Sequence, residues 1–354
     1  MGVMWLHGMV LLKLQIGTSQ LLTKAPMLMA HDAATCYAGF ESGTVAGISC
    51  YQWKTHAFKA NAPFMHAAGH IPSGFSSLLN CGARALDLRL TRGGPCTRQG
   101  IGQVCMHHSA LKIKDQTFES ELGTIVNWCA RNPTEIVLLK LVPDDMDADS
   151  PAIQAALDAH KIRSVPQCDG HGVDPATWTL EHARDLSRLP DGGLLLATWD
   201  SCVDDNFLPS IAYNPLDPSE SFRKLWRYTN DTVHRRGREG KFQEVQQIWQ
   251  SKQTFEDYVA AYPLHALDPQ PFKYGNLEST QDSQINRRVL ERISLHLGAP
   301  ALNLVKINDI CLHGLEIARA IGTNVTKEQE ALCVAMCGGA EPRNTCTNQS
   351  TAVI

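Results

Sequence analysis

Two segments of this chain place a histidine beside a second ionisable residue where a β-strand is expected to end. The first is His31 followed by Asp32 in PMLMAHDAAT, and the second is His107 followed by His108 in GQVCMHHSAL. Histidine titrates near neutral pH, so two such groups around one substrate fit the roles of general base and general acid. A single histidine among the 14 of the chain would be weak support for this chemistry.

A third segment, CGARALDLRL, lies between the two and carries Asp87 and Arg89 two positions apart. Residues i and i+2 of a strand share a face, so both side chains are expected to point into one space. A guanidinium fork matches the oxygens of a phosphate group, and the whole set therefore suits phosphodiester cleavage. The alternative is structural, with Arg84 and Arg89 as ion-pair partners at the rim of the fold.

Short apolar runs alternate with helix-like segments, which predicts an α/β fold with parallel, covered strands. We expect a single distorted TIM-type (β/α) barrel over residues 25–324, after an N-terminal extension (1–24) and before a cysteine-containing tail (325–354). Such barrels carry their chemistry at the C-terminal ends of the strands. The strand candidates are 25–31, 83–90, 103–108, 135–142, 193–200, 244–249 and 303–309; the helix candidates are 118–132, 150–161, 180–189, 279–298 and 312–322, with Ser150 and Ser279 as N-caps.

The composition is that of an ordinary globular protein, with 354 residues of which 44% are hydrophobic and 19% charged. The formal net charge of -4 and the lack of a dense Lys/Arg run give no electrostatic reason to expect nucleic acid. No run reaches the roughly 20 apolar residues that a membrane-spanning helix needs. We expect a monomer with no transmembrane segment.

Twelve cysteines, an even number, are many for a reduced cytosolic enzyme. Sequons at Asn230, Asn324 and Asn348 agree with a secretory route. We expect disulfides and an extracellular or secretory-pathway location. The alternative is a cytoplasmic protein with buried thiols.

The motifs HD, GARxxDxR, HH and NPTEIVLL, in this order, resemble the phosphatidylinositol-specific phospholipase C family in its X-domain or bacterial form, over about residues 25–324. The resemblance implies that His31 removes a proton from a hydroxyl beside the phosphodiester, whose oxygen then forms a cyclic phosphate. His108 would protonate the departing alcohol, with His107 as its packed neighbour. Asp32 would pair with His108, and Asp309 would orient His31.

The same resemblance implies a phosphoinositide or related glycerophospholipid at a membrane surface as the substrate, and no cofactor. Animal-type relatives bind calcium with an Asn after the first His and a Glu-x-Asp pair on the second strand. This chain has Asp32 and then Asp87-x-Arg89, so a cation stands where a ligand would be. It therefore resembles the metal-independent branch.

The predicted substrate-binding residues are Asp87, Asp200, Gln247 and Trp249. Bacterial relatives read inositol with an Asp and a Tyr in a strand of the type VQDxY, and EVQQIW places Gln247 and Trp249 there. Relatives carry a lysine after the EIVLL-like strand. In this chain, KLVPDD has Val142 and Pro143 at that place instead. Either the head group differs from plain myo-inositol, or the alignment over EVQQIW has slipped.

Two other functions remain open. One is a metal-dependent glycerophosphodiesterase or sphingomyelinase D-like barrel, which needs an acidic metal pair that Arg89 disfavours. The other is a catalytically silent phospholipase C-like binding module, which has no chemical reason to keep His31, Asp32, Arg89 and His108 together.

Overall fold

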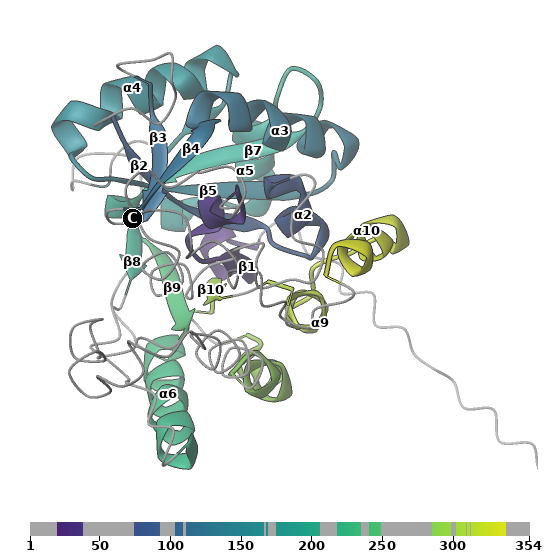
Figure 1. Ribbon diagram of the computed structural model, residues 1–354. Helices are drawn as coiled ribbons and strands as arrows, with labels where there is room; N and C mark the ends of the chain where they lie inside the picture. The colour runs from purple at the N-terminus through teal and green to yellow at the C-terminus, as the bar shows by residue number, and fades with distance from the viewer. Residues whose placement is uncertain are drawn as a thin grey trace, which may run out of the picture.

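The computed structural model describes residues 20–37, 74–92, 103–108, 111–165, 168, 175–205, 218–234, 241–248, 285–298, 302–308, 310–311 and 313–337. In these ranges ten strands join into one sheet, whose main path runs β6-β7-β5-β2-β1-β10-β9-β8 (Figure 1). Every neighbouring pair on this path is parallel. The strands are β1 (Met27–Ala30), β2 (Ala85–Thr91), β3 (Cys105–His108), β4 (Leu111–Thr117), β5 (Ile136–Pro143), β6 (Arg163–Ser164), β7 (Leu194–Trp199), β8 (Val203–Asp205), β9 (Phe242–Gln247) and β10 (Leu304–Ile307).

The eight parallel strands curl into a half-barrel, which confirms the predicted α/β class and the distorted barrel. The barrel is open, because its edge strands β6 and β8 are not paired with each other in the part of the chain that is described. These edges are only two and three residues long and offer few backbone groups to close a ladder. The strand at 103–108 differs from its prediction: β3 is antiparallel to β2 and forms a hairpin with β4, off the barrel path.

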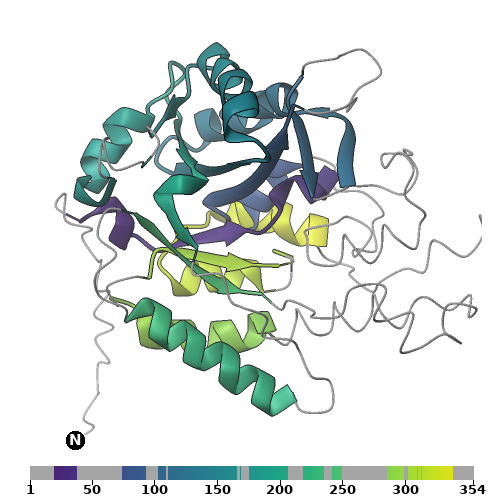
Figure 2. The ribbon, with the colours of Figure 1, turned by 90° about the vertical axis from the view of Figure 1, so that its left-hand side faces the viewer.

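Helices cover the outer face of the sheet. α3 and α4 lie together on one side, and α6 lies on another side next to the helix at residues 285–293 (Figure 2). The predicted N-cap Ser150 lies inside α4, since that helix begins earlier, where the Asp145 side chain accepts hydrogen bonds from two amides. The labelled helices are α2 (Phe75–Asn80), α3 (Phe118–Arg131), α4 (Met146–Ala159), α5 (Leu180–Ser187), α6 (Pro218–Val233), α9 (Gly314–Ala320) and α10 (Lys327–Cys337). No helix in these described ranges has the length and apolar character needed to cross a bilayer.

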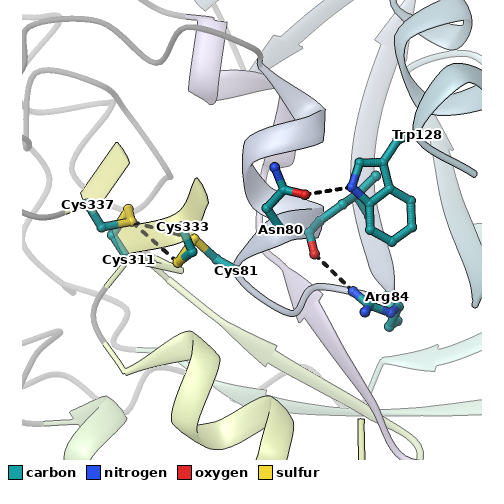
Figure 3. Close-up of a disulfide and its surroundings, with 8 residues drawn as sticks. Asn80, Cys81, Arg84, Trp128, Cys311, Cys333 and Cys337 are labelled. Atoms are coloured by element: carbon teal, nitrogen blue, oxygen red, sulfur yellow. Dashed lines mark hydrogen bonds between the residues drawn. A yellow bond between two sulfur atoms is a disulfide. The ribbon is translucent and has the colours of Figure 1, made fainter. Parts of the chain in front are cut away.

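Disulfides attach the C-terminal helix to the barrel. α10, the first part of the expected tail, is bonded to the residue that follows α2 and to the segment before α9 (Figure 3). The expectation of disulfides is thus confirmed, and Cys36 and Cys129 are buried free thiols in the part of the chain that the structure describes. The bonded pairs are Cys81–Cys333, Cys311–Cys337 and Cys168–Cys202.

Arg84 anchors the loop between α2 and β2. Its Nε pairs with Glu135 Oε2 at 3.0 Å, and its Nη1 donates to the Leu79 carbonyl at 2.9 Å. The guanidinium also lies 5.1 Å from the ring centroid of Trp128, whose Nε1 donates to Asn80 Oδ1 at 2.8 Å (Figure 3). The structural interpretation of Arg84 is therefore confirmed.

Replacing Cys81 and Cys333 together with alanine is expected to lower the free energy of unfolding by about 3 to 5 kcal/mol. The pair closes a loop with a sequence separation of 252 residues, and the entropy that a disulfide removes from the unfolded chain grows with loop length. The Cys168–Cys202 pair, with a separation of 34 residues, is the matched comparison and is expected to cost less. Urea unfolding of both double variants measures the difference, and a smaller loss for the first pair would contradict the expectation.

Candidate active site

The inward face of the curled sheet changes from apolar to charged toward the C-terminal ends of its strands. Because side chains two positions apart share a face, the inward-facing residues of a strand follow one another at every second position. The lower layer is apolar and buried, with Ala85, Leu138, Phe242 and Leu304. The next layer is charged and buried, with Asp87, Lys140, Glu244 and Lys306. The upper layer places His31, Arg89, Gln246 and Asn308 at the strand ends.

His31 follows β1 and is 6% exposed. Its Nδ1 lies 2.7 Å from Oδ1 of Asn308. An amide oxygen only accepts, so Nδ1 carries the proton of this bond and Nε2 is left as the basic nitrogen. Nε2 lies 3.3 Å from Oδ2 of the buried Asp32 carboxylate. Asn308 thus makes the contact expected from Asp309, which lies outside the described residues.

Asp32 joins His31 to Arg89. Its side chain is fully buried, and Arg89 Nε donates to its Oδ1 at 2.6 Å. The φ of Asp32 is 44°, a conformation that is uncommon outside glycine and that often marks a functional site. The Arg89 side chain is 36% exposed, so its two terminal nitrogens are left to meet an anion. The pairing expected between Asp32 and His108 lies outside the described side chains.

A continuous series of ion pairs lies beneath these residues. Lys306 Nζ is 2.8 Å from Asp87 Oδ2 and 2.9 Å from Glu244 Oε1. Lys140 Nζ is 2.8 Å from Glu244 Oε2 and 2.9 Å from Asp200 Oδ1. The two lysines, Asp87 and Glu244 have side chains that are at most 3% exposed, while the Asp200 side chain is 39% exposed. The series therefore runs from the buried interior to the solvent-facing rim.

The pairs favour the charged forms of Asp87, Glu244 and Lys140. Burial alone would raise the pKa of the Asp87 carboxyl, but Lys306, Lys140 and Arg89 outweigh it and hold that pKa well below its ordinary value. Burial also opposes ionisation of Glu244, yet Lys140 and Lys306 lower its pKa to about 2. Burial would lower the pKa of Lys140, but Glu244 and Asp87 raise it above its ordinary value.

The stability of the protein is expected to fall steeply in acid. The pKa values of Asp87 and Glu244 are lower in the folded than in the unfolded chain, so their contribution is present above about pH 4.5 and is lost as the pH falls toward 2. Urea unfolding at pH 7, 4 and 3 measures this loss. Asp87→Asn is expected to cost about 3 to 5 kcal/mol at pH 7 and to show a smaller acid-dependent fall.

The matched control is Glu330→Gln, which breaks an exposed ion pair with Arg319 and is expected to keep the wild-type pH profile. If the free energy of unfolding of Asp87→Asn falls in acid as much as that of the wild type, then Asp87 is not a source of the acid-dependent loss.

The paired histidines His107 and His108 lie at the end of β3, in the β3–β4 hairpin. His107 is 4% exposed, and its Nε2 lies 3.1 Å from Asp144 Oδ1, as suits a packed neighbour. The His108 backbone pairs with Leu111 in the β3–β4 hairpin, and its side chain is outside the described part of the structure.

Gln247 does not point into the interior. Its Nε2 donates to Thr229 Oγ1 of α6 at 2.6 Å, on the outer face of β9. The interior residues of β9 are Glu244 and Gln246, and Gln246 Nε2 donates to Glu244 Oε1 at 2.8 Å. The predicted placement was therefore off by one residue, which reverses the face. Trp249 lies outside the described residues.

Four interior residues were missed by sequence reasoning: Lys140, Glu244, Lys306 and Asn308. Their common signal is a polar or charged residue within a short apolar run of a parallel strand, where both faces are expected to be covered. A charge at such a position needs a buried partner of opposite sign.

His31, Asp32 and Asp87 offer ligand atoms within 4.8 Å of one another. Each of the two carboxylates already has a positively charged side chain as its partner: Arg89 pairs with Asp32, and Lys306 pairs with Asp87. A divalent ion placed among them would meet two fixed positive charges at close range. This group therefore does not fit a metal ion.

No protein-family model matches the chain, and no curated protein matches it. Among solved structures, a phosphatidylinositol-specific phospholipase C from Staphylococcus aureus is similar, with a TM-score of 0.51 at 9% identity over 86% of this chain and 95% of that one. The phosphatidylinositol-specific phospholipase C from Listeria monocytogenes has a TM-score of 0.49 at 14% identity over 87% and 95%. The S. aureus comparison shows that this chain shares the fold of that protein.

Proposed function

We propose that this chain is a phospholipase C-like phosphodiesterase that cleaves a phosphoinositide or a related glycerophospholipid without a metal ion. The observation that carries the proposal is the contact series Asn308–His31–Asp32–Arg89, which joins an imidazole of defined tautomer to a partly exposed guanidinium. These residues come from β10, β1 and β2, which are neighbours in the sheet. The fold shared with bacterial phospholipase C supports the same class.

In this proposal, His31 Nε2 takes the proton of a substrate hydroxyl adjacent to the phosphodiester. The freed oxygen attacks phosphorus and forms a new P–O bond, while the bond from phosphorus to the diacylglycerol oxygen breaks. His108 gives a proton to that departing oxygen. One proton is taken and one is returned, so the products are diacylglycerol and a cyclic phosphate.

Arg89 supplies the positive charge at the phosphate. Its Nε is held by Asp32, which fixes the guanidinium plane and leaves both terminal nitrogens for phosphate oxygens. The charge that develops on these oxygens in the transition state is then met by donors that are already in place.

The head group is proposed to lie beside Asp200, Lys140 and Gln246, which occupy the interior face next to the catalytic residues. Asp200 is the most exposed member of the ion-pair series and offers a carboxylate to sugar hydroxyls. The disulfides among the described residues fit an oxidising compartment, so we propose an extracellular or secretory-pathway enzyme that meets its lipid at a membrane surface.

The test is a panel of phospholipids with different head groups, presented in mixed micelles with and without EDTA. The proposal expects release of diacylglycerol from at least one phosphoinositide at the same rate with and without chelator. Activity that disappears with EDTA would support the metal-dependent alternative. No turnover of any phosphodiester would support a silent binding module.

A further inference from the structure

Lys306 holds a position that differs from that of an ordinary lysine. It lies in the middle of β10, between β1 and β9, and its side chain is 3% exposed (Figure 1). Its single ammonium group contacts two fully buried carboxylates from opposite sides, Asp87 on β2 and Glu244 on β9. Three strands of the half-barrel are thus joined through one positive charge.

Two carboxylates converge on the Lys306 ammonium. The Nζ–Oδ2 distance to Asp87 is 2.8 Å, and the Nζ–Oε1 distance to Glu244 is 2.9 Å. Two carboxylates converging on one point are a common way to bind a divalent ion such as Mg²⁺ or Ca²⁺. Without a cation between them they would repel each other in a buried, poorly screened environment.

The position also matters for the residues above it. Asp87 lies beside the catalytic pair, since its ligand atom is within 4.8 Å of those of His31 and Asp32. Arg89 follows Asp87 by two positions on the same face of β2. A shift of the Asp87 carboxylate would therefore be passed on to the base and to the phosphate-binding arginine.

We propose that Lys306 is a positioning residue that takes the place of a divalent metal ion, its ammonium acting as the resident cation between Asp87 and Glu244. The catalytic part of this inference rests on the proposed function; the cation-site part does not. It follows that the chain contains a latent divalent-cation site, which removal of the ammonium exposes.

The experiment uses Lys306→Met in the full chain, which keeps an unbranched side chain up to the ε position and removes the ammonium group. Mn²⁺ binding is measured by electron paramagnetic resonance without substrate. The wild type is expected to bind Mn²⁺ at least about two orders of magnitude more weakly than Lys306→Met, because removal of the ammonium leaves the Asp87 carboxylate without its lysine and leaves Glu244 ion-paired with Lys140 alone. Mn²⁺ is also expected to raise the Tm of Lys306→Met and to leave that of the wild type unchanged.

The matched control is Lys306→Met combined with Glu244→Gln, which removes one positive and one negative charge. It is expected to fold and to bind Mn²⁺ no better than the wild type. Equal Mn²⁺ affinity in Lys306→Met and the wild type would overturn the proposal. So would a Lys306→Met protein that stays unfolded at every Mn²⁺ concentration, since an ion that fills the site would restore the fold.

The kinetic readout separates positioning from a general loss of structure. In EDTA, Lys306→Met is expected to lose at least about tenfold in kcat with little change in KM, because the residue does not touch the substrate. Mn²⁺ is expected to restore part of kcat in this variant only. Full activity of Lys306→Met in EDTA would refute the positioning role. If the wild type cleaves no phosphodiester, the proposed function fails, and the Mn²⁺ measurements still decide the cation site.

Discussion

His31→Ala is expected to lower kcat/KM for phosphodiester cleavage by about 10²- to 10⁴-fold, the range that general base catalysis supplies. In the proposed mechanism, the variant removes the base that takes the proton of the attacking hydroxyl. The Asp32–Arg89 pair does not depend on the imidazole, so phosphate binding and the fold are expected to persist. Steady-state kinetics and the Tm measured on the same preparation test both parts.

The matched control is His182→Ala. His182 lies in α5, whose first residue is hydrogen-bonded to Gln20 near the N-terminal ends of the strands, away from the candidate site. It is expected to cleave at the wild-type rate. Near-normal activity of His31→Ala, or an equal loss in His182→Ala, would contradict the role of His31 as the base.

Arg89→Lys is expected to lose about 10²- to 10³-fold in kcat, a loss comparable with removal of one preorganised donor from an oxyanion site. Lysine keeps the positive charge, but one ammonium cannot hold Asp32 and present a two-pronged contact to phosphate at the same time. The measurement is kcat and KM on a soluble short-chain substrate, which avoids effects of membrane binding.

Arg92→Lys is the matched control for this substitution, because Arg92 directly follows β2 and is exposed. It is expected to behave as the wild type. If Arg89→Lys retains most of its activity, then the arginine contributes charge alone, and the proposed bidentate contact is wrong.

The sequence predicts the barrel class well because parallel, covered strands read as short apolar runs between amphipathic helices. It cannot predict that the barrel is open, since closure depends on how far the edge strands extend. The sequence also could not predict that β3 is antiparallel. The run 103–108 has the same apolar character as a barrel strand, and only its backbone pairing with β2 and β4 distinguishes it from one.

The candidate site, like the fold, was predicted only in part. Asp87 and Arg89 were predicted to share a face, and the i to i+2 rule succeeds because β2 is regular and seven residues long. Gln247 was misplaced because a one-residue error in register reverses the face of a whole strand. The family resemblance named Asp309 as the residue that orients His31, and Asp309 lies outside the described residues; the contact of His31 with the neighbouring Asn308 was not predicted.

The buried lysines show a further limit of sequence reasoning. Lysine is rarely buried unless it is paired, so Lys140 and Lys306 invite a surface interpretation. Their partners come from strands that are distant in the chain, and only the sheet order β5-β2-β1-β10-β9 brings them together. A lysine inside an apolar parallel strand is nevertheless a signal that can be read, because it demands a carboxylate on a neighbouring strand.

The most direct test of the proposed mechanism follows the first product of cleavage by ³¹P NMR, with a short-chain phosphatidylinositol and EDTA present. Attack by the neighbouring hydroxyl predicts the resonance of a five-membered cyclic phosphodiester, formed by the wild type and absent with His31→Ala. If the first product is instead an acyclic phosphate ester, then water is the nucleophile, and the assignment of His31 as the base for an internal hydroxyl is wrong.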